Sequence, residues 1–436
     1  MIIKRDEYIT QLVSKSWNNK AKIVTGIRRC GKSFLLNTLF RNYLLENGVS
    51  EDEIISIDLE KKSDARYRNP IALLDFVIRR ARNQSGRYYV FIDEIQMAAK
   101  IKNPDLEGVQ VSEEDGDLLY ITFYDVLNEL ISRPNLDVYV TGSNSRMLSK
   151  DIVTIFRDRG TEIMVYPLSF AEFYSVSNEE KADAFESYMR FGGMPSAVIE
   201  NDEKEKMKYL KELHKKVYFK DIVERYKLKD DTVLDALVDS LYSAVGSLTN
   251  VHNLANAAST LMQKGTSDNT VKSYIDFLED AYLMMEAKRY DIKGKKYFEY
   301  PQKYYAMDIG LRNAKLNFRQ IDSGHIMENI LFVELIRRGY SVDVGMVKIN
   351  SCNTGKKMMS QHEIDFIVNT GTNKIYIQSA WNLDSRDKED QETLSLKNTG
   401  DFFRKIVVTG GNGKMWTDEN GITYIGVIPF LLQDIL

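Results

Sequence analysis

The 436-residue sequence has little cysteine, little histidine and no long apolar run. Its two cysteines cannot build a disulfide framework, and this scarcity is typical of the reducing cytoplasm, where we expect the protein. The four histidines show no spacing typical of metal ligands. No apolar run approaches the ~18 residues of a membrane span, and charges interrupt the N-terminal segment MIIKRDEYITQL. We therefore expect neither a membrane segment nor a signal peptide.

The chain also lacks a strong excess of either charge. Its 59 Lys and Arg residues against 63 Asp and Glu residues give a formal net charge of -4. Any nucleic-acid surface would therefore have to be local. Hydrophobic residues at 43% and charged residues at 28% are ordinary for a globular protein. A chain of this length exceeds one compact core, so we expect two to four domains. The strand, loop and helix patterns along the chain indicate an α/β multidomain protein.

A glycine-rich loop follows the first β-type run. Residues 22–25 (KIVT) lead into residues 26–33 (GIRRCGKS), and a helical pattern of apolar residues comes next. Strand, GxxxxGK[ST] and helix in this order predict a parallel-sheet P-loop NTPase domain. Gly26 and Gly31 let successive backbone N–H groups point at phosphates, and the following helix offers the positive end of its dipole.

The side chains of this loop have distinct expected roles, with ATP and Mg²⁺ as the cofactors. Lys32 should act in catalysis by reaching the β- and γ-phosphates, and Ser33 should bind Mg²⁺. Arg28 and Arg29 are less specific, because each could meet phosphate or face solvent. The candidate cofactor-binding residues are Gly26, Ile27, Arg28, Arg29, Cys30, Gly31, Lys32, Ser33 and Phe34.

A second β-type run ends in paired carboxylates. Residues 88–92 (YYVFI) are continuously apolar, as expected for a buried parallel strand. Asp93 and Glu94 follow, and open α/β sheets place their ligands at the carboxyl ends of strands. We expect Asp93 to hold Mg²⁺ through water and Glu94 to polarise the attacking water as a catalytic residue. A solvated strand end is the alternative interpretation.

A third β-type run, residues 138–140 (VYV), also ends in polar residues. Ser143 and Asn144 are candidate sensors that would contact the γ-phosphate or the attacking water, and Asn144 is counted among the catalytic candidates. The alternative is an N-cap for a helix that begins near Arg146. The sequence leaves both interpretations open.

In this order the motifs resemble a widespread group of bacterial and archaeal AAA-type ATP-binding proteins. Members of that group carry an N-terminal P-loop domain and a C-terminal domain of unknown function. The resemblance covers nearly the whole chain and implies an ATPase. It is carried by YIT near residue 8 and by TGIRRCGKS, YVFIDEIQ, DVYVTGSNSRMLS, FRDRG, YPLSFAEFY, GGMPSAV, YYAMDIGLRNA, MENILFVEL, EIDFIV and IYIQSAW.

The resemblance also implies arginines that act near the γ-phosphate, sometimes across a subunit interface of a homo-oligomer. Arg157 and Arg159 in FRDRG are the candidates, and Arg159 is counted as catalytic. The alternative is a pair of surface arginines that meet Asp158 or Glu162. Asp158 stands where the family commonly has glycine, and it could hold one arginine away from phosphate.

The middle of the chain, residues 201–320, is predicted to be helical. A helix near 251–262 and the segment 267–284, with Ser267 or Asp268 as N-cap, resemble part of a winged helix-turn-helix. The next segment, 287–300 (AKRYDIKGKKYFEY), predicts a hairpin.

This hairpin is the best nucleic-acid surface in the sequence. Residues 288–305 hold six Lys or Arg, two Asp or Glu, and interleaved aromatic residues. Basic side chains bind phosphates and aromatic rings stack on bases. Lys293, Lys295 and Lys296 are therefore candidate DNA contacts, although a winged helix can also serve as a packing module.

The last segment, residues 321–436, has an element order that resembles the restriction-endonuclease-like fold. Glu328 and Asp365 match two metal-binding positions of that fold. Where active members have Glu-x-Lys, this chain has Gln378-Ser379-Ala380, so the residue that would stabilise developing charge is missing. We expect a degenerate nuclease domain. Lys348 or Lys374 could replace the lysine in space, which the sequence leaves open.

The sequence therefore predicts three domains and one main activity. The domains are an AAA-like ATPase domain (1–200), a helical winged-helix domain (201–320) and a restriction-endonuclease-like α/β domain (321–436). The expected function is Mg²⁺-dependent ATP hydrolysis that drives conformational change and is coupled to nucleic-acid binding. The alternatives are an ATP-regulated DNA-binding switch and an ATP-gated nuclease.

Overall fold

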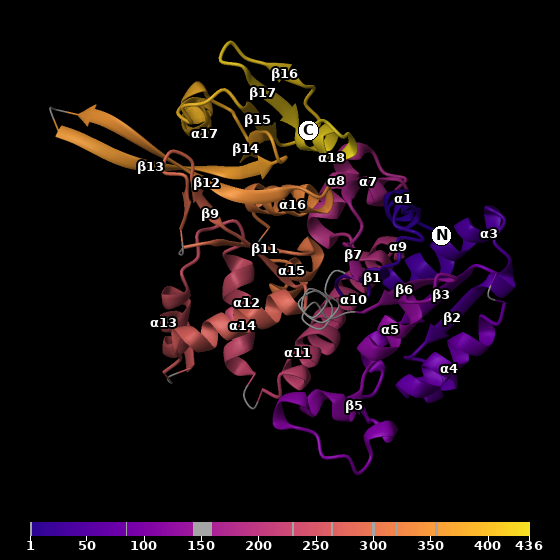
Figure 1. Ribbon diagram of the computed structural model, residues 1–436. Coiled ribbons are helices and arrows are strands. Elements are labelled where there is room, and N and C mark those ends of the chain that lie inside the picture. Colours follow the sequence, from indigo (N-terminus) through magenta and orange to yellow (C-terminus); the bar gives the residue numbers. More distant parts are fainter. Residues whose placement is uncertain are drawn as a thin grey trace. The chain divides into compact units, whose positions relative to one another are not determined.

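The structure is a computed structural model that forms two compact units, residues 2–166 and residues 167–436, called here the N-terminal and C-terminal units (Figure 1). Within the chain it describes residues 2–83, 85–142, 159–228, 231–262, 265–298, 301–319, 321–353 and 356–436. In these ranges, no helix has the length and apolar character needed to cross a membrane. The three domain boundaries expected from the sequence stay predictions.

The N-terminal unit is built on a parallel five-stranded sheet with the strand order β2-β3-β6-β1-β7. Its strands are β1 (Ala21–Thr25), β2 (Ile54–Asp58), β3 (Tyr88–Asp93), β6 (Leu136–Thr141) and β7 (Gly160–Met164), and a separate small sheet pairs β4 (Ile101–Lys102) with β5 (Tyr120–Ile121). Because β6 lies between β1 and β3, the strands of the glycine-rich loop and of the paired carboxylates are not neighbours.

Helices cover both faces of this sheet (Figure 1). Alternate strand residues such as Val90 and Ile92 join the core formed with α4 and α5. On the other face, the Phe40 ring lies 5.8 Å from the Phe91 ring and 5.1 Å from the Tyr139 ring. The helices are α1 (Asp6–Ser14), α2 (Lys32–Phe34), the π-helical η1 (Leu35–Phe40), α3 (Arg41–Glu46), α4 (Pro70–Arg80) and α5 (Phe123–Ile131).

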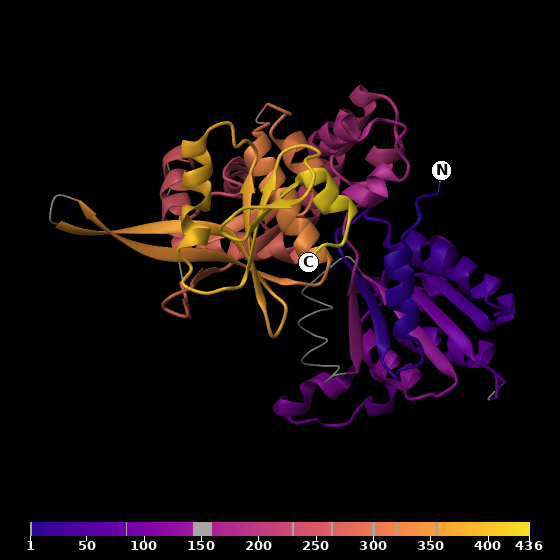
Figure 2. The same ribbon diagram turned by 90° about the horizontal axis from the view of Figure 1, so that it is seen from above.

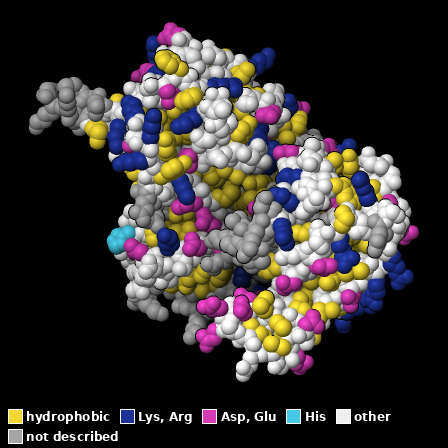
Figure 3. Space-filling view, viewed as in Figure 1, with side chains coloured by type: hydrophobic (Ala, Val, Ile, Leu, Met, Phe, Trp, Pro, Cys, Tyr) yellow, Lys and Arg dark blue, Asp and Glu magenta, His cyan; other side chains and the backbone are white. Residues whose placement is uncertain are grey.

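Short 3₁₀ helices complete the N-terminal unit. They are η2 (Glu51–Glu53), η3 (Lys62–Arg68), η4 (Ile95–Met97), η5 (Pro104–Leu106) and η6 (Glu113–Leu119). The first turn of η6 is entirely acidic. Figure 3 shows acidic side chains gathered at the lower edge of the view, over this part of the unit.

The C-terminal unit contains an eight-stranded mixed sheet with the order β10-β9-β12-β13-β14-β15-β17-β16. Its strands are β9 (Arg289–Asp291), β10 (Lys296–Tyr297), β12 (Ser341–Asn353), β13 (Lys356–Asn369), β14 (Lys374–Ala380), β15 (Arg404–Thr409), β16 (Trp416–Thr417) and β17 (Ile422–Gly426), and a separate pair joins β8 (Met284–Ala287) to β11 (Lys303–Ala306). Figures 1 and 2 show that the β12–β13 ribbon extends well beyond the rest of its sheet.

Helices make up much of the C-terminal unit before its large sheet. They are α7 (Phe170–Tyr174), α8 (Lys181–Phe191), α9 (Pro195–Ile199), α10 (Glu203–Glu212), the π-helical η8 (Leu213–Phe219), α11 (Lys220–Arg225), α12 (Thr232–Ser243), α13 (Val251–Met262), α14 (Asp268–Asp280) and α15 (Ile309–Lys315). The later helices are α16 (Ser323–Arg337), α17 (Arg386–Lys397) and α18 (Val427–Leu432).

The two helices expected for a winged helix-turn-helix occur where the sequence placed them, as α13 and α14. Ser267 caps α14, because its side chain accepts a hydrogen bond from Thr270 N. The hairpin that follows pairs β9 with β10. However, β9 also pairs with β12, so the hairpin is the edge of the large sheet rather than a separate wing. The winged helix therefore stays a prediction.

Candidate functional site

The glycine-rich loop turns sharply between the end of β1 and the start of α2. Gly26 has φ +133°, and a Cβ at this position would lie 2.1 Å from the carbonyl oxygen of Val165. Gly31 has φ +99° and directly precedes the helix. Only glycine tolerates these two conformations at low cost. The loop thus needs both glycines that the sequence singled out.

Lys32 lies over the loop that it follows. Its side chain is buried, and Nζ donates hydrogen bonds to the carbonyl oxygens of Gly26 and Ile27, both at 3.0 Å. These carbonyl groups hold the ammonium above the backbone of the loop. A bound phosphate would meet the ammonium there, because the N-terminus of the following helix faces the same place.

Buried contacts support the loop from behind. Arg5 Nη1 donates to the carbonyl oxygen of Cys30 at 3.1 Å, and Arg5 Nη2 donates to that of Tyr166 at 2.9 Å. The Cys30 thiol donates to the carbonyl oxygen of Val165 at 3.3 Å and is fully buried. The side chain of Cys30 therefore belongs to the support of the loop, and only its backbone could serve a ligand.

The other candidate residues of the loop differ in exposure. Ile27 is buried, Arg28 is half-buried, and Arg29 is exposed with φ +64°. Ser33 and Phe34 are exposed at the start of the helix. Arg29 thus reaches solvent from a left-handed turn.

Hydrogen bonds connect the loop to the ends of β3 and β6. The Ser33 hydroxyl bonds to the Asp93 carboxylate. The Thr141 hydroxyl donates to Asp93 Oδ1, and the backbone N–H of Glu94 donates to Thr141 Oγ1 at 2.9 Å. The structure therefore brings Ser33, Asp93 and Glu94 together. Ser33 follows β1, whereas Asp93 and Glu94 lie at the end of β3, and these two strands are not adjacent.

Thr141 is a component of this site that the sequence argument did not single out. It is the last residue of β6, directly before the Gly-Ser-Asn stretch from which the sensors were chosen. Its hydroxyl connects the two carboxylate residues Asp93 and Glu94. The sequence signal that could have identified Thr141 is its position as a polar residue at the end of an apolar strand.

The Asp93 carboxylate is buried, and burial raises its pKa. The hydrogen bonds from Thr141 and Ser33 oppose that rise, and the Glu94 and Asp58 charges add to it. A divalent cation would stabilise the charged carboxylate here, and hydroxyl and carboxylate oxygens are ligands that Mg²⁺ prefers. The pair Ser33 and Asp93 therefore fits the expected ion. The described residues include no group of three or more Asp, Glu, His or Cys that could enclose a metal by itself.

Glu94 has an unusual backbone conformation at the end of β3. Its φ is +52°, in the left-handed region that is costly for a residue with a side chain. The Gln96 amide donates to Glu94 Oε2. The backbone and this amide together fix the direction of the carboxylate.

Of the remaining candidates of the nucleotide site, the structure describes Arg159. Ser143, Asn144 and Arg157 lie outside the described residues. Arg159 is exposed, and its carbonyl oxygen accepts a hydrogen bond from Ala21 N at the amino end of β1. The loop follows the opposite end of β1, about 16 Å away for a five-residue strand. Arg159 thus has no place in the site of its own unit, and an action on a second copy stays a prediction.

A second cluster of charged groups lies inside the C-terminal unit. The buried ammonium of Lys303, at the start of β11, lies 2.8 Å from Glu328 Oε1, 2.6 Å from Glu363 Oε1 and 3.5 Å from Asp365 Oδ1. Glu328 belongs to α16, whereas Glu363 and Asp365 belong to β13. Thus Glu328 and Asp365, expected together from the resemblance, share one cation. We call these four residues the Lys303 cluster.

Burial shapes the titration of the Lys303 cluster. Burial, and then the nearby Asp365 charge, raise the pKa of Glu328 against the opposing effect of Lys303. Tyr305 OH donates to the same Glu328 oxygen at 2.7 Å. Burial lowers the pKa of Lys303, but the surrounding carboxylates outweigh burial and raise it. The lysine is therefore a permanent cation of this site.

Strand β14, the third strand of the expected nuclease site, contributes Gln378 and Ser379 to hydrogen bonds within the C-terminal unit. Ser379 N donates to Asp365 Oδ2 at 2.8 Å. The Gln378 oxygen accepts from Asp365 N at 3.4 Å, and its amide nitrogen donates to Glu392 at 3.1 Å. Neither proposed replacement for the missing lysine reaches the cluster. Lys348 pairs with Asp291 at 2.9 Å, and Lys374 Nζ lies 5.1 Å from the centroid of the Tyr290 ring.

Comparison with known proteins assigns parts of the chain to families. A family model described as an AAA domain matches residues 18–174, and a model described as a domain of unknown function matches residues 182–322. The Walker-type ATPase of Pyrococcus abyssi is a similar solved structure, with 16% identity and a TM-score of 0.46 over 72% of this chain and 96% of that one. This likeness is too distant to bear on function.

Two proteins recorded as uncharacterised are similar over most of the sequence. A Methanocaldococcus jannaschii protein is 26% identical over 387 residues, covering 85% of this chain and 77% of that protein. A Haemophilus influenzae protein is 32% identical over 437 residues, covering 99% of both chains. The chain therefore belongs to one family with the Haemophilus influenzae protein, and its residues 18–174, which include the parallel P-loop sheet, match an AAA domain.

Proposed function

We propose that the N-terminal unit binds ATP with Mg²⁺ and hydrolyses it. The observation that carries this proposal is the hydrogen-bond chain from Ser33 through Asp93 and Thr141 to Glu94. It holds a cation ligand and a carboxylate beside the helix N-terminus that follows the phosphate loop. Phosphoryl transfer needs positioning and charge stabilisation above all, which this arrangement supplies.

Each residue has one role in the proposed reaction. Bound Mg²⁺ would neutralise charge that develops on the phosphates. Lys32 leaves the carbonyl groups of Gly26 and Ile27 and binds the β- and γ-phosphates. Ser33 and Asp93 would hold the cation. Glu94 orients a water and accepts its proton as the water oxygen bonds to the γ-phosphorus and ADP leaves with the bridging oxygen. Thr141 positions the Asp93 carboxylate and the backbone N–H of Glu94.

Nucleotide binding is tested first with the Lys32→Ala variant. Loss of a charge-assisted contact to phosphate, at about 1.5–3 kcal/mol, should weaken ATP binding about 10- to 100-fold. Isothermal titration with ATP and Mg²⁺ measures this. The control is Lys100→Ala, which removes an exposed lysine of the same unit. ATP affinity equal in the parent and in Lys32→Ala would contradict the proposal.

For the C-terminal unit we infer that the Lys303 cluster does not cut nucleic acid. Lys303 Nζ lies among oxygens of Glu328, Glu363 and Asp365, which is the place a divalent cation would need. The Lys303 ammonium supplies positive charge at this place, but it lacks the Lewis acidity of a metal cation. The domain would then serve binding or assembly.

This inference is tested with supercoiled plasmid and Mg²⁺ or Mn²⁺. We expect the parent protein to leave the plasmid intact. Metal-dependent nicking that Asp365→Ala abolishes, and that the exposed-site variant Asp434→Ala retains, would contradict it and revive the ATP-gated nuclease.

A DNA-binding switch is the second candidate, and the observation that favours it is the basic edge of the large sheet. Lys293, Lys295 and Lys296 are exposed on the β9–β10 hairpin, and Lys293 Nζ donates to the carbonyl oxygen of Lys348 at 3.1 Å. Figure 3 shows many Lys and Arg side chains over the part that holds β9, β12 and α17. Tight ATP binding with negligible turnover, together with salt-dependent DNA binding, would select this function.

A further inference from the structure

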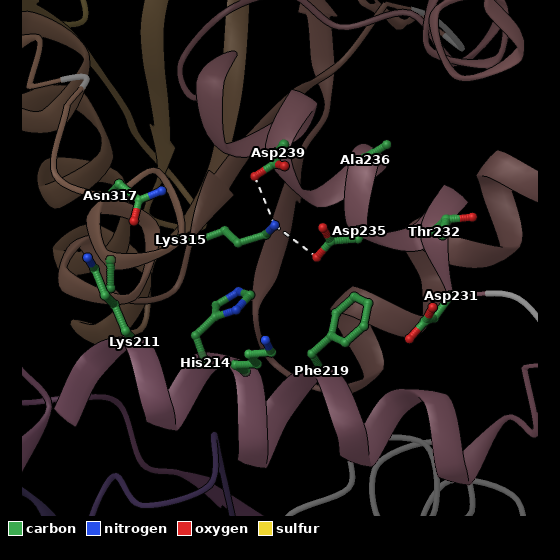
Figure 4. Close-up of a pocket in the computed structure, with 12 residues that line it drawn as sticks. Lys211, His214, Phe219, Asp231, Thr232, Asp235, Ala236, Asp239, Lys315 and Asn317 are labelled. Atoms are coloured by element: carbon green, nitrogen blue, oxygen red, sulfur yellow. Dashed lines mark ion pairs between the residues drawn. The ribbon is translucent and has the colours of Figure 1, made fainter. Parts of the chain in front are cut away.

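A cavity of about 640 Å³ opens in the C-terminal unit between the helices η8, α12 and α15 (Figure 4). All its lining residues lie between positions 211 and 317, inside the segment matched by the domain of unknown function. Its volume falls in the range of ~300–1,000 Å³ that is usual for small-molecule sites. The cavity is therefore distinct from the nucleotide site of the N-terminal unit.

A buried histidine in the wall of this cavity has an unsatisfied nitrogen. His214 is 3% exposed, and its Nε2 has no hydrogen-bond partner in the part of the chain that the structure describes. Leaving such a group unpaired costs about 1–3 kcal/mol. In Figure 4 the imidazole points from η8 into the cavity, toward Lys315. A group supplied from within the cavity would satisfy it.

Three lysines and three aspartates line the cavity, so their charges cancel in number but are unevenly placed. Lys315 is paired with Asp235 at 2.8 Å and Asp239 at 3.0 Å. Lys211 and Lys215 have no carboxylate partner among the described residues, and both line the cavity. The side formed by Lys211 and Lys215 is therefore locally positive, and it favours an anion.

These unpaired groups share one side of a helical run. Lys211, His214 and Lys215 stand at relative positions i, i+3 and i+4, which places them on one helix face. Lys211 Nζ lies 6.0 Å from the centroid of the Phe318 ring, so it would turn toward His214 and Lys215 for the two ammonium groups and the imidazole N–H to meet one phosphate group.

The π-helical η8 adds a flat apolar surface beside that face. Its wider i→i+5 turn brings Phe219 to the same side as His214, and Figure 4 shows both rings directed into the cavity. π-helical turns occur often at functional sites. A planar ring could lie on Phe219, with the Asp231 carboxylate beyond it as an acceptor for amino groups.

We propose that this cavity binds a small phosphate ester with a planar ring, which is the chemistry of a nucleoside monophosphate. Lys211 and Lys215 hold the phosphate, His214 Nε2–H donates to it, and the ring lies on Phe219.

The test uses the full-length chain with Lys32→Ala, so that the phosphate loop contributes little. Titration with adenosine monophosphate should give saturable binding of one molecule per chain. Adding Lys215→Ala should weaken binding at least ~10-fold, which is about 1.4 kcal/mol. The matched control is Lys216→Ala, the neighbouring lysine that pairs with Glu212 at 3.1 Å, and it should leave affinity unchanged.

Two further measurements distinguish the parts of the ligand. Inorganic phosphate and adenosine should each bind at least ~10-fold more weakly than the monophosphate, because each lacks one half of the contacts. His214→Phe should weaken the monophosphate while the circular dichroism spectrum is retained. Phosphate that binds as well as the monophosphate would mean an adventitious ion only. That result, absent binding, or equal losses in Lys215→Ala and Lys216→Ala would each overturn the proposal.

Discussion

The hydroxyl of Thr141, at the end of β6, contacts both Asp93 and Glu94. The adjacent positions of these two acids in the sequence do not indicate this contact. Thr141 donates to Asp93 and accepts from the backbone of Glu94. The sequence could predict both acids, because they follow an apolar strand. It could not predict this support, because Thr141 is 47 residues from Glu94 and meets it only through the sheet. The register of two neighbouring parallel strands creates the contact.

Replacing Thr141 with valine should lower ATP hydrolysis without abolishing nucleotide binding. Valine keeps the shape and removes the hydroxyl that positions both acids. The loss of a hydrogen bond to a charged group, at about 1.5–3 kcal/mol, predicts a 10- to 100-fold lower kcat. Steady-state phosphate release measures it, and Thr141→Ser should restore most of the rate. Equal rates in the valine variant and the parent would rule out this positioning role.

Lys303 is the second residue whose role required the structure. Its partners Glu328, Glu363 and Asp365 come from α16 and β13, up to 62 residues away in sequence. The missing lysine of the third strand was read from the sequence. The position of Lys303 among the three acids could not be predicted from the sequence, because no local spacing indicates it.

Replacing Lys303 with methionine should destabilise the C-terminal unit. Removing one partner of a buried ion pair leaves charges uncompensated, which costs about 3–5 kcal/mol. Urea unfolding followed by circular dichroism measures the change. The control, Lys295→Met on the exposed hairpin, should stay within about 0.5 kcal/mol of the parent. A loss below about 1 kcal/mol in Lys303→Met would show that the acids do not depend on the lysine.

At the scale of elements, the sequence predicted those with strong local signals. The helix α13 has the expected bounds, and α14 has an expected cap at Ser267. The β9–β10 hairpin also forms where a lysine-glycine turn predicts it. Its pairing with β12 was not predicted, because that contact joins residues more than 50 positions apart in the chain. Local patterns fix elements, whereas pairing between distant strands depends on the whole fold.

The buried histidine of η8 gives the C-terminal unit a specific pH dependence. Burial, and then the Lys315 charge, lower the pKa of His214 from 6.5 to about 4. His214 therefore becomes protonated below about pH 6.5 in the unfolded chain, but only below about pH 4 in the folded chain. Folding stability from this group is fully present above pH 6.5 and is lost as pH falls toward 4, by up to about 3 kcal/mol.

His214→Phe should therefore lose less stability than the parent between pH 7.5 and pH 5. The free energy of unfolding in urea at both pH values measures this difference. The control is His252→Phe, which replaces an exposed histidine and should follow the parent. Identical pH dependence in the parent and in His214→Phe would contradict a neutral buried imidazole.

At the scale of the whole molecule, the chain combines an AAA domain with a larger C-terminal unit. A ligand that binds only the folded N-terminal unit should stabilise that unit alone. ATP with Mg²⁺ at 100 times its Kd should add about 2.7 kcal/mol to its stability. Thermal unfolding should show this as an upward shift of one transition. At the same ATP concentration the gain should fall to about 0.4–1.4 kcal/mol in Lys32→Ala, where ATP binds 10- to 100-fold more weakly, and an undiminished shift there would place the nucleotide elsewhere.

The central claim is that Glu94 activates water for ATP hydrolysis at the end of β3. The most direct test is the rate of phosphate release by Glu94→Gln at saturating ATP and Mg²⁺, with Glu46→Gln on the exposed face of α3 as the control. We predict a fall of at least ~100-fold in Glu94→Gln, consistent with the loss of a general base, with ATP affinity and the control unchanged. A Glu94→Gln variant that hydrolyses ATP as fast as the parent would contradict the claim.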